Sequence, residues 1–108
     1  MTFNEYEQLA QRTSNTNIEL DKLINGCLGL AGESGEVLDI IKKALYQGHT
    51  MDIEKVAEEL GDVLWYIAEI CAALHVDMDE VAEQNIAKLM TRYPDGFDAE
   101  LSIHREDD

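Results

Sequence analysis

A single proline in 108 residues is the feature that most restricts how this chain can fold. Pro94 lies near the C-terminus, so about ninety residues run without the strongest helix breaker. Ala, Leu, Ile, Glu and Lys dominate, and the alternating apolar and polar pattern of half-buried strands is scarce. The sequence therefore predicts an all-α fold, built as one domain over residues 1–108.

Apolar residues at helical spacing, together with capping and turn signals, divide the chain into four helices. Short polar connections between them predict a four-helix-type bundle in which neighbouring helices pack antiparallel. The tail, from about residue 98 to 108, is polar and is expected to be flexible. The expected helices are residues 3–12, about 18–47, about 52–75 and about 77–92.

Glycines interrupt the second of these helices. Each glycine lowers helix propensity by about 1 kcal/mol relative to alanine. Propensity alone therefore predicts a break near Gly32, with residues 29–35 as a loop. The alternative is that the glycines allow another backbone or a ligand to approach closely. The residues concerned are Gly26, Gly29, Gly32 and Gly35.

The charge is strongly acidic, with 8 Lys and Arg against 23 Asp and Glu and a formal net charge of −15. Such a surface repels phosphate backbones and anionic lipids, so we expect neither a nucleic-acid polymer nor a membrane as partner. The first residues, MTFNEYEQ, carry acids where a signal peptide has positive charge. Cys27 and Cys71 lie in apolar runs, as expected for reduced thiols. We therefore expect a cytoplasmic protein.

Two acid pairs stand beside core-facing residues. Glu33 and Glu36 lie in the second helix, and Glu59 and Asp62 lie in the third. Residues three apart are about 60° apart around a helix, so each pair shares a face. Antiparallel packing of the two helices would bring four carboxylates together, which requires a compensating cation. Oxygen ligands favour Mg²⁺, with Mn²⁺ as a substitute, over Zn²⁺.

Acidic residues are frequent in this chain, so the competing interpretation is that the two acid pairs lie on solvent-exposed helix faces and bind no metal. Glu58, Asp39 and Glu54 are expected to be surface acids. Glu69 is expected at the surface too, although it lies near the face of Asp62 and keeps a possible role. A di-iron carboxylate bundle would need Glu-x-x-His steps, and neither pair is followed by one.

Three sequence blocks carry a resemblance to a known family. They are residues 29–36 (GLAGESGE), 58–66 (EELGDVLWY) and 85–94 (NIAKLMTRYP). With these blocks, the chain from about residue 18 to 97 resembles the MazG-like, all-alpha nucleoside triphosphate pyrophosphohydrolases.

The resemblance implies a helical bundle whose second helix continues through the glycines, and assembly as a homodimer or homotetramer with sites close to the subunit interface. It implies cleavage of a nucleoside triphosphate between the α and β phosphates. Carried over by position, Glu33, Glu36, Glu59 and Asp62 would hold magnesium. Glu36 or Glu59 would accept the proton of the attacking water.

Five further residues are candidates for substrate binding. Asn85, Lys88 and Arg92 share one face of the fourth helix and are suited to phosphate oxygens or sugar hydroxyls. Trp65 and Tyr66 follow the second acid pair, and one of them is suited to stack on a base. The competing interpretations are ordinary surface ion pairs and aromatic core residues.

The sequence is compatible with three functions. The first is a magnesium-dependent nucleotide pyrophosphohydrolase that cleans the nucleotide pool. The second is an enzyme of the same superfamily restricted to dUTP or dCTP. The third is a non-catalytic helical module that binds a partner protein. Acids beside the core argue against the third, because a bundle does not need them.

Overall fold

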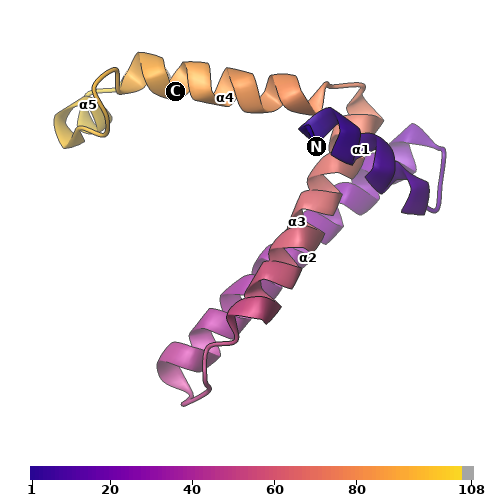
Figure 1. The fold of residues 1–108 in the computed structure, drawn as a ribbon, viewed down its shortest axis with the longest axis horizontal. Helices are drawn as coiled ribbons and strands as arrows, with labels where there is room; N and C mark the ends of the chain where they lie inside the picture. Colours follow the sequence, from indigo (N-terminus) through magenta and orange to yellow (C-terminus); the bar gives the residue numbers. More distant parts are fainter. Residues whose placement is uncertain (106–108) are drawn as a thin grey trace.

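The computed structural model describes residues 1–105, and it is helical almost throughout (Figure 1). No β-strand occurs within these residues, which confirms the predicted all-α fold. The elements are α1 (Phe3–Ala10), a 3₁₀ turn η1 (Gln11–Thr13), α2 (Glu19–Tyr46), α3 (Ile53–Leu74), α4 (Met78–Arg92) and α5 (Ala99–Ile103).

The centre of the fold is an antiparallel hairpin of α2 and α3, which lie side by side along most of their length (Figure 1). α2 is continuous for 28 residues, so the break that propensity alone predicts near Gly32 is wrong, and the continuous helix that the resemblance implies is confirmed. The physical reason is helix packing. A Cβ atom on Gly29 would lie 2.1 Å from Cε1 of Tyr66, and one on Gly26 would lie 2.6 Å from Cγ1 of Ile70. These two glycines let α3 approach closely, and that packing outweighs their low propensity.

α4 leaves this hairpin instead of folding back along it (Figure 1). α3 ends at Leu74 and is capped by His75, whose φ of 56° is left-handed. α4 begins after Asp77, whose side chain accepts a hydrogen bond from the Glu80 amide at 3.2 Å. Antiparallel packing is therefore confirmed for α2 and α3 and wrong for α3 and α4. The short connection changes the direction of the chain, because a left-handed residue ends one helix three residues before the next begins.

α1 holds the α3–α4 junction in place. The Phe3 amide donates to Oδ1 of Asp79 at 3.0 Å, and the Asp79 amide donates to Oδ1 of Asn4 at 2.9 Å. The small core lies at this junction. Its buried members are Ala10, Ala68, Cys71 and Met78, and Tyr6, Leu64, Trp65 and Ile67 pack against them.

The isolated chain exposes more surface, and has a larger radius of gyration, than a compact monomer of the same mass. Its accessible surface is 7890 Å², whereas a compact monomer of this mass exposes about 6,100 Å². Its radius of gyration is 17.0 Å, against about 13 Å for a compact domain of this length. Exposed apolar residues follow one stripe of α2: Ile24, Leu28, Leu38 and Leu45. No helix among residues 1–105 is long and apolar enough to cross a membrane.

The tail contains one short helix. α5 spans Ala99–Ile103, and Asp98 caps it by accepting hydrogen bonds from the amides of Glu100 and Leu101. Residues 106–108 lie outside the described part of the chain. The flexibility expected for about 98–108 stays a prediction.

Candidate metal centre

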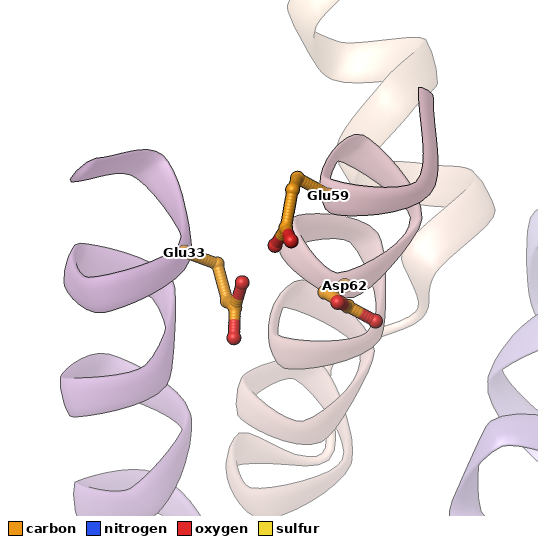
Figure 2. A group of neighbouring side chains, drawn as sticks. All are labelled: Glu33, Glu59 and Asp62. Atoms are coloured by element: carbon orange, nitrogen blue, oxygen red, sulfur yellow. The ribbon is translucent and has the colours of Figure 1, made fainter. Parts of the chain in front are cut away.

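Three of the four predicted metal ligands come together between α2 and α3. Glu33 projects from α2 toward Glu59 on α3, and Asp62 lies one turn further along α3 (Figure 2). Each residue offers one carboxylate oxygen, and these three oxygens lie within 4.8 Å of one another. Glu59 is 9% exposed, Glu33 is half-buried and Asp62 is exposed. The group is thus open on one side to a ligand.

The crowding of these carboxylates changes their protonation. The pKa of Glu33 is raised to about 7, chiefly by a hydrogen bond with Glu59, and further by desolvation and the negative charges of Glu59, Asp62 and Glu36. The same hydrogen bond, together with Lys55, lowers the pKa of Glu59. Glu33 is therefore about half protonated near neutral pH, and its proton reduces the repulsion between the two carboxylates. A divalent cation would replace that proton, and the all-oxygen donor set fits Mg²⁺ or Mn²⁺.

Lys55 is a member of this site that the sequence reasoning missed. Its Nζ lies 3.4 Å from Oε1 of Glu59 and 3.9 Å from Oε2 of Glu58. The signal that could have revealed it is the i, i+4 spacing from Lys55 to Glu59 on one helix face. Glu58 is exposed, as expected for a surface acid.

Glu36 does not join the group of three. It lies one turn along α2 from Glu33, is exposed, and adds to the negative field that raises the pKa of Glu33. Its assignment as a metal ligand and as the base stays a prediction.

The predicted aromatic residues lie beside the acids. Glu33, Asp62, Trp65 and Tyr66 line an open pocket of about 410 Å³. The two rings are perpendicular, with centroids 5.1 Å apart. Tyr66 packs over Gly29, as described above, while the Trp65 indole donates hydrogen bonds to the Ala10 carbonyl and to Oγ1 of Thr13. The pocket therefore joins a carboxylate group to an aromatic wall.

The three candidates on α4 lie apart from this pocket in the single chain. Asn85 and Lys88 line a different pocket of about 420 Å³ on α4, with Val81 and Gln84. Arg92 is the last residue of the same helix. Because α4 turns away from the hairpin, one chain does not bring these side chains to the acids (Figure 1).

The expectation that Glu69 lies at the surface is wrong, because its exposed fraction is 0%. It lies on the same side of α3 as Asp62, two turns further along. Its burial was not predictable from spacing, because Gln11 and Ser14, which are distant in the sequence, cover it.

A known protein family matches most of the chain. Residues 22–97 match the MazG nucleotide pyrophosphohydrolase domain. The chain belongs to this family. The matched MazG region contains the acid group, the aromatic wall and the three candidates on α4, and it belongs to a family of nucleotide pyrophosphohydrolases that use divalent metals.

A phage protein supplies the second comparison. The chain is 35% identical over 69 residues to the "Gene 37 protein" of Mycobacterium phage L5, and the match covers 60% of this chain and 60% of the phage protein. The chain thus spans less than two thirds of that relative's length. No solved structure matches the chain with significance.

Proposed function

We propose that the chain hydrolyses nucleoside triphosphates between the α and β phosphates, releasing the monophosphate and pyrophosphate in a magnesium-dependent reaction. The observation that carries the proposal is the group of three carboxylates next to an aromatic pocket in a MazG domain. The protein carries a net charge of −15, and its substrate is an anion as well. A cation between them is what makes binding favourable.

Glu33, Glu59 and Asp62 would hold the metal, and Glu36 would complete the set from the next turn of α2. Their fit to a cation rests on the spacing of the three oxygens and on the nearby negative charges, which contribute to the raised pKa of Glu33. Bound Mg²⁺ supplies charge neutralisation for the phosphates and a more acidic water molecule. Mn²⁺ is the expected substitute.

The chain's own base is Glu36 or Glu59. Glu59 has a lowered pKa, because Glu33 and Lys55 stabilise its charge, so it is ionised at neutral pH. An ionised carboxylate can accept a proton from water held between it and the α phosphate. Lys55 supports this role by keeping the carboxylate charged.

The substrate would bind across two subunits. Trp65 or Tyr66 would stack on the base, beside the metal group. Asn85, Lys88 and Arg92 would hold phosphate oxygens or sugar hydroxyls from α4 of a second copy, since α4 of the same chain turns away. The surface excess of about 1,800 Å² over a compact monomer is large enough to supply the roughly 800 Å² per partner of a standard interface. We therefore propose a homodimer or homotetramer.

The cellular role that fits this reaction is removal of unwanted nucleotides in the cytoplasm. Neither a nucleic-acid polymer nor a membrane is a proposed partner, because the net charge opposes both. Restriction to dUTP or dCTP is a narrower form of the same proposal.

Two adjacent acids provide a matched test. Glu59→Ala removes a proposed ligand, while Glu58→Ala removes an exposed neighbour that also pairs with Lys55. With Mg²⁺ and a panel of canonical and modified (d)NTPs, pyrophosphate release should fall by at least about 100-fold in Glu59→Ala and stay within about twofold in Glu58→Ala. Equal losses in both variants, or turnover unaffected by Glu59→Ala, would contradict the site. A folded wild type that binds Mg²⁺ and turns over no nucleotide would favour the interaction module.

A further inference from the structure

Glu69 is a fully buried carboxylate that the proposed reaction does not use. It accepts hydrogen bonds from Nε2 of Gln11 at 2.9 Å, from Oγ of Ser14 at 3.2 Å and from Nδ2 of Asn25 at 3.4 Å. All three donors are uncharged, and Lys22 joins the network by donating to Oε1 of Gln11. Glu69 thereby connects three parts of the chain: η1, the residues just after it, and α2.

The position of Glu69 relates it to the metal group. Glu59, Asp62, Tyr66 and Glu69 follow one another on α3 at spacings of three, four and three residues, so they share one face of the helix. Seven residues correspond to about 10 Å along the axis. Glu69 thus lies about 10 Å beyond Asp62 on the side of α3 that meets α2, past the aromatic wall of the pocket.

The segment that Glu69 anchors also holds Trp65. The indole Nε1 donates to Oγ1 of Thr13 at 2.9 Å and to the Ala10 carbonyl at 3.1 Å. Thr13 lies between Gln11 and Ser14, and both of these residues are bonded to Glu69. The carboxylate therefore fixes the segment on either side of the residue that orients the indole.

Stability alone does not account for an acid at this position. A buried carboxylate loses its hydration, and three neutral donors replace only part of it. An apolar side chain of similar volume would fill the same space without that cost. What the carboxylate adds is one defined arrangement of three separate donors, and hence one orientation of Trp65.

We propose that Glu69 is a positioning residue for nucleotide binding: it anchors residues 11–14 against α3 and so fixes Trp65 as the wall against which the base of the substrate lies. This inference rests on the proposed function for its link to a nucleotide. The link from Glu69 to Trp65 does not rest on it.

Trp65 is the single tryptophan of the chain, so its fluorescence reports this arrangement directly. In nucleotide-free protein, Glu69→Ala should shift Trp65 emission to longer wavelength and increase quenching by acrylamide. Glu69→Gln keeps the length of the side chain and one acceptor oxygen, so its changes should be smaller. Glu83→Gln, at an exposed position on α4, is the control and should match the wild type.

Steady-state kinetics tests the link to substrate. Glu69→Ala should raise KM by about tenfold, the scale of losing a well-placed base–aromatic stack, with kcat within about twofold. A folded Glu69→Ala variant with unchanged emission and unchanged KM would overturn the proposal. A fall in kcat at constant KM would also overturn it, because that pattern belongs to a residue that acts on the reaction itself.

A milder variant covers the case in which Glu69→Ala does not fold. Thr13→Val removes the hydroxyl that accepts from Trp65 and leaves Glu69 in place. It should raise KM in the same direction with smaller effect, and an unchanged KM and emission would overturn the proposal. If the wild type turns over no nucleotide, the proposed function fails, whereas the anchoring of Trp65 is still decided by fluorescence.

Discussion

Metal binding to the acid group should strengthen as the pH rises, because the proton held between Glu33 and Glu59 must leave when the cation enters. The pKa of Glu33 is raised to about 7, whereas that of Glu59 is lowered. Over the range from pH 6 to 8, Glu33 is therefore the ligand whose charge changes. Metal affinity follows the fraction of ligand that is ionised.

The magnitude follows from that pKa. Glu33 is about one-tenth ionised at pH 6 and about nine-tenths ionised at pH 8, so the apparent affinity for Mg²⁺ should rise by about tenfold. Each bound ion should release about nine-tenths of a proton at pH 6 and about one-tenth at pH 8. Glu33→Gln carries no such proton and should bind Mg²⁺ more weakly, with little dependence on pH.

Calorimetric titration of nucleotide-free protein with MgCl₂ measures both quantities. Two buffers with different heats of ionisation separate proton release from binding, and Glu83→Gln serves as the charge control. An affinity that is the same at pH 6 and 8, or binding without proton release at pH 6, would refute this account of the site.

The same pKa predicts how the metal-free protein responds to pH. Glu33 has a higher pKa in the folded chain than its ordinary 4.5, so its contribution to stability is fully present below about pH 4.5 and is lost as the pH rises through about 7. The Tm of the wild type, measured relative to Glu33→Gln, should therefore fall between pH 5 and 8. A Tm difference that stays constant over this range would contradict the assigned pKa.

Two further pairs of substitutions test helix packing and assembly. Gly29→Ala should destabilise the protein by about 1–3 kcal/mol in urea unfolding, because its Cβ would meet the ring of Tyr66. In the control Gly32→Ala, the new Cβ meets open space, so this variant should be neutral or stabilised by up to about 1 kcal/mol. Equal effects of the two variants would refute the close helix contact. Leu28 is 70% exposed on α2, and Leu28→Glu should shift the protein toward monomer in analytical ultracentrifugation, whereas Ile103→Glu on α5 should not. A wild type that is already monomeric would refute the proposed assembly.

The helices and the acid pairs could be predicted because their signals are local. α3 was expected at about 52–75 and spans Ile53–Leu74, and α4 was expected at about 77–92 and spans Met78–Arg92. Each helix begins after an aspartate N-cap, Asp52 or Asp77. The side chain of each cap accepts a hydrogen bond from an amide three residues later, so the signal lies within one turn of the helix. Antiparallel packing of α2 and α3 then followed from a short connection, and it brought Glu33 to Glu59 and Asp62.

Features that depend on distant partners could not be predicted in the same way. Helix propensity alone predicts that Gly29 weakens the helix, because its contact with Tyr66 is made only in the folded structure. The sequence predicts that Glu69 is exposed, because the two residues that cover it, Gln11 and Ser14, are more than fifty positions away in the sequence. The direction of α4 depends on the left-handed conformation of His75, which residues other than glycine rarely adopt, although histidine is among the enriched types.

The identity of the products tests the central claim most directly. The purified protein is incubated with Mg²⁺ and each nucleotide of the panel, and the products are assigned by ³¹P NMR with and without EDTA. If the proposed reaction is correct, nucleoside monophosphate and pyrophosphate form in equal amounts, and neither forms in the presence of EDTA. Nucleoside diphosphate with orthophosphate, or turnover that persists in EDTA, would contradict it.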